Sequence, residues 1–189
     1  YLAGHEAVGI VAGVQSKGVG TSLKHFAANN QETDRLRVSA NISQRALREI
    51  YFPAFEHIVK TAQPWTIMCS YNRINGVHSA QNRWLLTDVL RDEWGYEGIV
   101  MSDWGADHDR VASLNAGLNL EMPPSYTDDQ IVYAARDGRI QPEQLDRMAQ
   151  GMVDLVNKTR AAMSVENYRF DVDAHDEVAH QAAVESMVL

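Results

Sequence analysis

The stretch GIVMSDWGADHD, residues 98–109, places an aspartate directly after a run of apolar residues. A carboxylate in the middle of a buried strand would lose its hydration at a high cost, so Asp103 marks the end of that strand. The same change from apolar to polar occurs twice earlier, at Lys24-His25 and at Ser70-Tyr71-Asn72. These three clusters are the first candidates for chemistry.

An aspartate at a strand end, with Lys24, His25 and Tyr71 at other strand ends, suits a carboxylate that acts as a nucleophile or base. Trp104 would offer an apolar platform for the face of a sugar, and the basic side chains would hydrogen-bond its hydroxyls. Two simpler interpretations stay open. Asp103 can be a loop residue or a helix N-cap, and Trp104 can be a core residue at the strand end.

A metal site is the other chemical interpretation, since Asp103, Asp107, His108 and Asp109 are all ordinary ligand types. The remaining histidines lie in no recognised ligand spacing, so we expect no metal. Residues 107–109 are more simply the acidic start of a helix, placed near its positive end. We expect no cofactor either, because no Gly-rich nucleotide fingerprint follows any strand.

Apolar spacing predicts the elements that must position these side chains. Predicted strands cover residues 21–26, 65–71, 98–102 and 117–122, and predicted helices cover 2–14, 43–60, 84–94, 107–115, 128–136, 142–163 and 175–189. Ser43 is the expected N-cap of the second helix. The stripe that this helix should bury consists of Leu47, Ile50, Tyr51, Ala54, Phe55 and Ile58. By composition, residues 72–82 are loop.

Nearly all-apolar strands that alternate with helices indicate an α/β fold with a parallel sheet covered by helices. Four such units fit roughly the second half of a (β/α)8 TIM-like barrel, followed by C-terminal helices. In a barrel the strand ends form one rim, where active sites are built. A doubly wound sheet is the competing architecture, but its Gly-rich fingerprint is missing.

Bulk properties exclude several classes of partner. A formal charge of −8 without any basic run argues against nucleic acid. No apolar segment approaches the roughly 20 residues that cross a bilayer, so we expect no membrane segment. The single cysteine, Cys69, lies in an apolar run and is predicted to be a buried free thiol. The chain starts without Met inside a helical pattern, so it reads as an excised piece and leaves the compartment open.

Three segments, taken in order, carry a resemblance: LKHFAANNQETDR (23–35), TIMCSYNRINGVHSAQN (66–82) and GIVMSDWGA (98–106). They resemble the β-glucosidases of glycoside hydrolase family 3. The similarity continues through AGLNLEMP (116–123) to the closing AHQAAVESMVL, and so covers essentially the whole chain.

The resemblance implies hydrolysis of terminal, non-reducing β-D-glucosyl residues through a covalent glycosyl-enzyme, with a β-glucoside or oligosaccharide as substrate. The Asp of the SDW motif, Asp103, would be the nucleophile. Five other residues would bind the substrate: Lys24, His25, Met68, Tyr71 and Trp104. A Lys24 ammonium close to Asp103 would help to keep the carboxylate ionised. Glu32 and Arg35 are expected to hold their loop through an ion pair.

The resemblance also implies that residues 1–163 form the C-terminal part of the barrel. Residues 164–189 would be a linker and helix leading toward a second domain, which supplies the acid/base residue. Retaining chemistry needs carboxyl groups about 5 Å apart, and the sequence places none of Glu32, Asp34 or Glu121 so. We expect the chain alone to be inactive, and its open sheet edges to favour self-association.

The sequence leaves three alternatives to this function open. Another glycone such as xylose, or phosphorolysis in place of hydrolysis, would use the same family framework. A non-catalytic carbohydrate-binding remnant of the barrel would bind sugar and turn nothing over.

Overall fold

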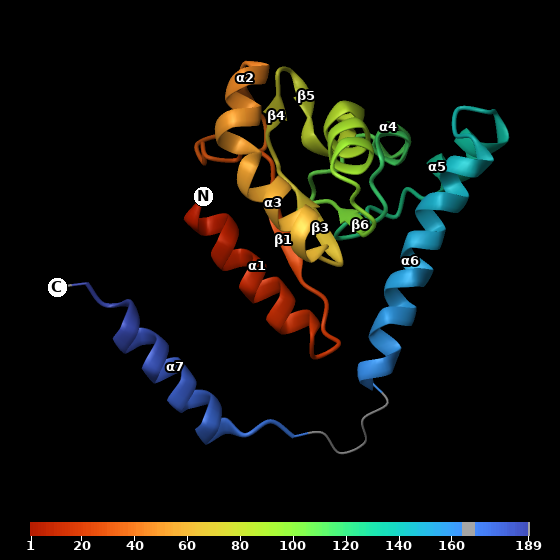
Figure 1. Ribbon diagram of the computed structural model, residues 1–189. Helices are drawn as coiled ribbons and strands as arrows, with labels where there is room; N and C mark the ends of the chain where they lie inside the picture. Colours follow the sequence, from red (N-terminus) through yellow and green to blue (C-terminus); the bar gives the residue numbers. More distant parts are fainter. Residues whose placement is uncertain (164–168, 189) are drawn as a thin grey trace.

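The computed structural model describes residues 1–163 and 169–188, which form a mixed α/β structure (Figure 1). Its central sheet has three parallel strands in the order β1-β3-β6. Their bounds are Ser22–Phe26, Thr66–Cys69 and Ile99–Met101. In register, Leu23 lies opposite Ile67, and Met68 lies opposite Met101. Three of the four predicted strands are thereby confirmed.

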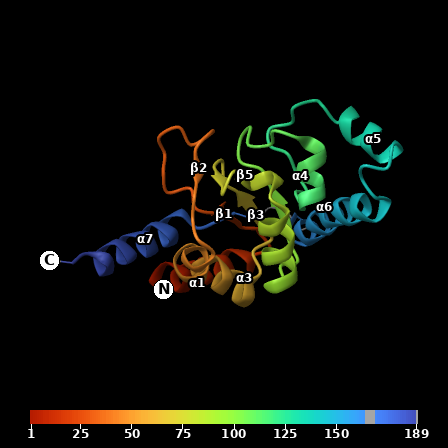
Figure 2. The same ribbon diagram turned by 90° about the horizontal axis from the view of Figure 1, so that it is seen from above.

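Helices cover this sheet, as its apolar strands require. All four residues of β3 are buried. Helices α1 (Leu2–Gln15) and α3 (Pro53–Ala62) pack together beside β1 and β3, as the two views in Figures 1 and 2 show. The helix η3 (Trp84–Glu93) ends at Trp94, and Gly95 adopts a positive φ of 70° where this helix was predicted to end.

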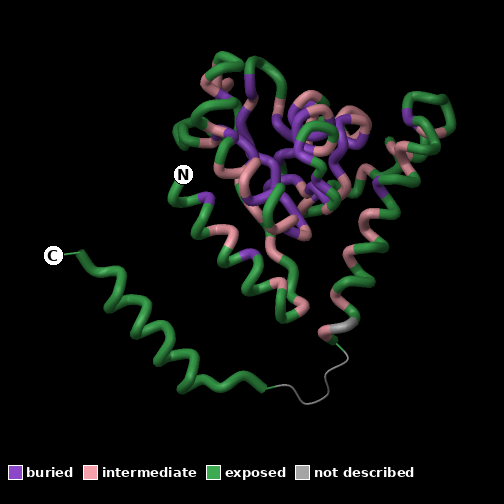
Figure 3. The backbone as a smooth tube through the Cα atoms, in the orientation of Figure 1, coloured by how far each residue is buried: buried purple, intermediate pink, exposed green. Residues whose placement is uncertain are grey.

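The main core joins β1, the start of α3 and the end of η3 through aromatic side chains. The ring of Phe26 lies 5.8 Å from that of Phe52 and 5.6 Å from that of Trp94. Phe52 and Trp94 meet edge to face at 5.5 Å, a favoured aromatic geometry. Figure 3 shows that the buried residues concentrate in this part of the molecule. Cys69 is a free, buried thiol, as predicted.

The prediction of a loop over residues 72–82 is wrong in part. Strands β4 (Arg73–Ile74) and β5 (Val77–His78) form an antiparallel hairpin, and β2 (Ser39–Ala40) pairs with β4 in parallel. The 3₁₀ turn η2 (Ser79–Gln81) follows. Asn75 and Gly76 form the hairpin turn with φ of 51° and 89°. An Asn-Gly pair accepts two positive φ values at little cost, and it is the local signal for this hairpin.

The predicted helix over residues 43–60 is interrupted. Ser43 is its N-cap, as predicted, and its Oγ accepts a hydrogen bond from the Ala46 N–H at 3.2 Å. The elements are α2 (Gln44–Ala46), the wide π-helical turn η1 (Leu47–Tyr51) and α3. Pro53 has no N–H to continue a regular helix, and Phe52 N–H bonds instead to the Leu47 carbonyl. The extra residue in this turn shifts the buried stripe, so Ile50 is 71% exposed, against expectation.

The fourth predicted strand, residues 117–122, is not a strand. It forms a single bridge, in which Leu120 pairs in parallel with Met101. Beyond it, Glu121 enters an ion pair with Arg110, and Pro123 offers no N–H to extend a ladder. Helix α4 spans Arg110–Ala116 and begins later than predicted, because Asp109 caps it through a bond from Ala112 N–H.

Three further helices follow α4 within the described ranges (Figure 1). They are α5 (Asp129–Arg136), α6 (Pro142–Met163), which contacts β6, and α7 (Val172–Ser186). The bounds of α6 are as predicted, whereas the predicted linker at 164–168 lies outside the described residues. Every residue of α7 is exposed (Figure 3). Among the described residues, no helix combines the length and apolarity that a membrane span requires.

Candidate active site

The three parallel strands bring their carboxyl ends to one edge of the sheet. His25 lies in β1, Met68 in β3, Tyr71 two residues beyond β3, and Asp103 two residues beyond β6. The Nε2 atom of His25 is 3.4 Å from the Oδ2 atom of Asp103. Residues 78 positions apart in the chain therefore meet across the end of β3.

Asp103 is the buried acid of this edge, with 6% of its surface exposed. Its Oδ1 accepts a hydrogen bond from its neighbour's backbone, Trp104 N–H, at 2.8 Å. Its Oδ2 is buried and has no hydrogen-bond partner among the described residues. Buried polar atoms are nearly always paired, so an unpaired carboxylate oxygen calls for an explanation. Since Asp109, not Asp103, caps the following helix, a capping role does not supply one.

Tyr71 is buried next to this carboxylate. Burial and the negative charge of Asp103 raise the pKa of the Tyr71 hydroxyl, so the group stays protonated and able to donate a hydrogen bond. The guanidinium of Arg35 lies 4.7 Å from the centre of the Tyr71 ring, within the range of a cation–π contact. Arg35 also pairs with Glu32 at 2.9 Å, which confirms the predicted ion pair in this loop.

Buried hydroxyls fix the segment that carries Tyr71. Ser70 Oγ donates to the Ala27 carbonyl at 2.9 Å and lies 2.8 Å from Ser79 Oγ. Ser79 Oγ in turn donates to the Asn72 carbonyl at 2.9 Å. The turn after β3 is thereby tied to the end of β1. No local pattern of residues predicts these contacts.

The other predicted site residues differ in exposure. Met68 is 5% exposed, whereas Trp104 is 53% exposed, so Trp104 is not a core residue at the strand end. Lys24 is exposed, and within the part of the chain that the structure describes it forms no ion pair. The contact with Asp103 that was expected of Lys24 is made by His25.

The sequence matches the model of the glycosyl hydrolase family 3 N-terminal domain over residues 1–155. The chain belongs to glycosyl hydrolase family 3. It is 90% identical over its whole length to an exo-α-(1→6)-L-arabinopyranosidase of Bifidobacterium breve, of which it covers 25%. A crystal structure of a family 3 β-glucosidase from Bifidobacterium adolescentis is 97% identical, with a TM-score of 0.99. That match covers all of this chain and 28% of the other.

A more distant structure has the same fold over the matched residues. It is β-glucosidase 3B of Thermotoga neapolitana in complex with α-D-glucose, which is 41% identical with a TM-score of 0.90. The match covers 96% of this chain and 27% of that one. The chain thus spans about a quarter of the length of the family 3 relatives that it matches.

Two cavities of this family 3 chain flank the strand ends. One, of about 280 Å³, is lined by His25, Asn29 and Tyr51 among others. The other, of about 540 Å³, is lined in part by Arg35 and His108. His25, which lines the first cavity, contacts Asp103, and Arg35, which lines the second, contacts Tyr71. Space is therefore available on either side of the candidate site.

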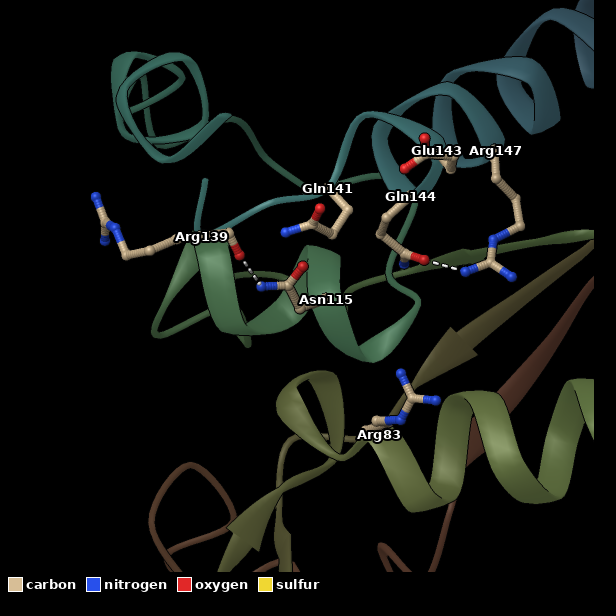
Figure 4. A pocket seen from close by; sticks show the side chains of 7 residues that line it. All are labelled: Arg83, Asn115, Arg139, Gln141, Glu143, Gln144 and Arg147. Atoms are coloured by element: carbon tan, nitrogen blue, oxygen red, sulfur yellow. Dashed lines mark hydrogen bonds between the residues drawn. The ribbon is translucent and has the colours of Figure 1, made fainter. Parts of the chain in front are cut away.

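A larger cavity of about 660 Å³ lies elsewhere, between η3, α4 and the start of α6 (Figure 4). Arg83 and Arg147 point toward one another across it, whereas Arg139 points away. Arg139 is neutralised by Asp137 at 2.8 Å. None of the predicted site residues lines this cavity, so it is not the candidate active site.

The carboxylates considered as acid/base partners are all engaged in ion pairs. Glu32 pairs with Arg35, Asp34 with Arg37 at 2.9 Å, and Glu121 with Arg110 at 3.4 Å. Within residues 1–163 and 169–188, no three side chains of His, Cys, Asp or Glu are grouped so that they could hold a metal ion.

Proposed function

We propose that the protein is an exo-acting glycoside hydrolase that releases terminal, non-reducing β-D-glucosyl residues with retention of configuration. The observation that carries the proposal is the buried Oδ2 atom of Asp103, which accepts no hydrogen bond among the described residues and lies 3.4 Å from His25 Nε2. A nucleophile needs an oxygen that faces the substrate rather than the protein. Membership of glycosyl hydrolase family 3 supports the reaction class.

In this mechanism the ionised Asp103 attacks the anomeric carbon through one carboxylate oxygen. The bond to the leaving oxygen breaks as a separate carboxylic acid protonates that oxygen, and a covalent glycosyl-enzyme results. Water, activated by the same second residue, then releases the sugar and regenerates Asp103. Family relatives of this chain include a β-glucosidase whose structure holds glucose.

The other site residues would each hold part of the sugar. His25 and Lys24, both on β1, would donate hydrogen bonds to hydroxyls. Tyr71, kept protonated, would donate a hydrogen bond to Asp103 once the site is occupied and would lose that bond as the carboxylate charge is consumed. Met68 and the exposed ring of Trp104 would provide apolar contact for a sugar face.

We further propose that residues 1–163 are the C-terminal part of a (β/α)8 barrel and that 164–189 lead toward a second domain. The parallel order β1-β3-β6 and the coverage of about a quarter of each relative support this. Because the carboxylates Glu32, Asp34 and Glu121 are paired, the acid/base residue would come from outside this chain.

A second candidate is removal of α-L-arabinopyranosyl units, which the 90% identity to an arabinopyranosidase favours. The same nucleophile serves both reactions. The two glycones differ in the configuration at C4 and in the hydroxymethyl group. Selection between them therefore depends on the side chains that contact these two positions of the sugar.

A panel of nitrophenyl glycosides tests these assignments in the intact natural polypeptide that contains these 189 residues. β-D-Glucoside, α-L-arabinopyranoside and β-D-xyloside are compared, with and without phosphate. We expect the β-D-glucoside to have the highest kcat/KM and phosphate to have no effect. A preference for the arabinopyranoside would favour the second candidate, and phosphate-dependent turnover would indicate phosphorolysis. Sugar binding without any turnover would indicate a carbohydrate-binding remnant.

We also expect the 189-residue chain, prepared alone, to self-associate through its sheet edges. In the described part of the chain, β1 pairs only with β3, so its other edge is open to a further strand. Size-exclusion chromatography with light scattering should show dimers or larger species. A single monomeric peak across a hundredfold range of concentration would contradict this expectation.

A further inference from the structure

A buried charged cluster adjoins the candidate nucleophile, and neither the sequence motifs nor the proposed mechanism accounts for it. Its centre is Arg110, the first residue of α4, whose side chain is only 17% exposed. The guanidinium contacts three carboxylates: Nη1 lies 3.1 Å from Asp107, Nε 3.4 Å from Glu121, and Nη2 3.3 Å from Asp128. One cation thus joins three separate segments.

Two of the three acids are as buried as the arginine. The side chain of Asp107 has no exposed surface and that of Glu121 is 7% exposed, whereas that of Asp128 is 78% exposed. Asp107 also accepts a hydrogen bond from Ser113 Oγ at 2.7 Å, and Glu121 accepts one from Ser125 N–H at 2.9 Å. Buried charges of this kind persist only when they are paired, so Arg110 holds both acids in place.

The cluster belongs to the same loop as Asp103. Asp107 follows Asp103 by four residues, and between them Ala106 N–H bonds to the Asp103 carbonyl at 3.0 Å. A turn of this kind leaves little freedom between the two aspartates. Asp103 and Asp107 therefore lie in one tight turn.

The opposite segment, residues 120–122, is fixed to both ends of the loop 102–107. At one end Met122 N–H bonds to Ser102 Oγ at 2.8 Å, and Gly105 N–H bonds to the Met122 carbonyl at 3.0 Å. At the other end Arg110 joins Asp107 to Glu121. The loop 102–107 is thus clamped from both sides, with Asp103 between the clamps.

We propose that Arg110 is a positioning residue for the nucleophile: by joining Asp107 to Glu121 it holds the loop 102–107 so that Asp103 Oδ2 faces the substrate. This inference rests on the proposed function. Arg110 touches no reacting atom in this account and acts only through the loop. Its loss should slow formation of the glycosyl-enzyme more than it weakens binding of the sugar, because a displacement of about 1 Å can cost about a hundredfold in rate.

The test measures the rate of covalent trapping by a 2-deoxy-2-fluoro glucoside in the intact natural polypeptide, comparing Arg110→Gln with Arg110→Lys and the unchanged protein. Arg48→Gln is the matched control, since it removes a bidentate arginine–carboxylate pair, to Glu93, on the helical side of the molecule. Each trapping rate is divided by the concentration of molecules able to react, which is the total amount of label incorporated when the reaction is complete. The KM for a nitrophenyl glucoside is measured alongside.

We expect Arg110→Gln to trap about 10-fold to 100-fold more slowly with KM changed less than threefold, and Arg110→Lys to recover part of the rate. Arg48→Gln should trap at the unchanged rate. A trapping rate for Arg110→Gln within twofold of the unchanged protein overturns the inference, as does a loss explained wholly by a smaller labelled fraction. If Arg110→Gln does not fold, Glu121→Gln, which removes one of the two buried acids that Arg110 joins, decides by the same criterion.

Failure of the proposed function gives a different pattern. The unchanged protein would then either fail to turn over glucosides or turn them over without taking up label at Asp103, and the nitrophenyl glycoside that it does turn over replaces the glucoside. In that case the kcat of Arg110→Gln against Arg48→Gln still decides whether the cluster serves the reaction.

Discussion

Two aspartates four residues apart in one loop have opposite environments. Asp103 has a buried oxygen without a partner, whereas both oxygens of Asp107 are engaged by Arg110, Ser113 and the backbone of Asp109. Both side chains are nearly inaccessible, so burial does not distinguish them. Their hydrogen-bond partners distinguish them. A carboxylate whose bonds are all made inside the protein supports structure, and one with an open position is available to a substrate.

The same comparison explains why acid residues alone are a poor guide to chemistry. The loop contains Asp103, Asp107 and Asp109, which take three roles: candidate nucleophile, ion-pair partner and helix cap. Substitutions that remove charge without changing shape should separate these roles.

The largest effect is expected for Asp103→Asn. Loss of the nucleophile should lower kcat by a factor on the order of 10⁴ or more, as for other members of a catalytic unit. The free energy of unfolding should be unchanged or slightly higher, because a buried charge whose Oδ2 accepts no hydrogen bond is removed. Steady-state turnover of a nitrophenyl glucoside and chemical denaturation measure the two quantities. Retention of full activity would rule out Asp103 as the nucleophile.

Asp107→Asn, unlike Asp103→Asn, should lower the stability of the fold. Removing one partner from a buried ion pair leaves Arg110 short of compensation and should destabilise the fold by about 3 kcal/mol. Denaturation in urea gives the value. Asp34→Asn is the control, since it breaks an exposed pair with Arg37 and should cost less than about 1 kcal/mol. Equal losses for the two variants would show that the Asp107 cluster is no more than a surface ion pair.

Tyr71→Phe should reduce kcat by about tenfold to a hundredfold, the value of one hydrogen bond to a charged group. The ring and its contact with Arg35 remain, so stability should change little. Turnover of the nitrophenyl glucoside and thermal unfolding provide the measurements. A variant with unchanged kcat would exclude a role for the hydroxyl beside Asp103.

The smallest effect concerns the dependence of stability on pH near the hairpin. Burial, followed by the positive charges of His108 and Arg73, lowers the pKa of His78 from its ordinary 6.5. The unfolded chain therefore takes up the proton first, so the contribution of His78 is complete above pH 6.5 and is lost as the pH falls toward its folded pKa.

His78→Gln should accordingly show a smaller drop in melting temperature between pH 8 and pH 5 than the unchanged protein. The amide oxygen of Gln can still accept the bond that Arg73 Nε donates to His78 Nε2 at 3.0 Å. Groups remote from the His78–His108 contact titrate equally in both proteins and cancel in the difference. Identical pH profiles would contradict the account of this site.

The sequence predicted those parts of the fold that have a local signal. Apolar runs ended by polar residues predicted β1, β3 and β6, and Ser43 predicted a helix start. The hairpin at 73–78 was not predicted, because its two-residue strands are too short to show an alternation of apolar and polar residues. The pair Asn75-Gly76 was nevertheless a usable signal for its turn. Pro53 was a usable signal for the break in the helix.

The sequence predicted which residues make up the site, but not the contacts between distant segments that hold them. Motifs selected His25, Tyr71 and Asp103, and the parallel sheet places their strand ends at one edge. No periodicity reveals that Arg110 would bind acids from three segments, because such contacts depend on how distant segments meet. The difference between Asp103 and Asp107 is likewise invisible in a sequence that shows two acids in one loop.

The central claim is that Asp103 carries the reactive oxygen of this loop. The most direct test is mass spectrometry of the intact natural polypeptide after incubation with a 2-deoxy-2-fluoro glucoside, followed by peptide mapping. The account predicts one added sugar per molecule, located at Asp103, with Asp107 unlabelled. A label on Asp107 or on any other residue, or turnover of glucosides without any label, would contradict it.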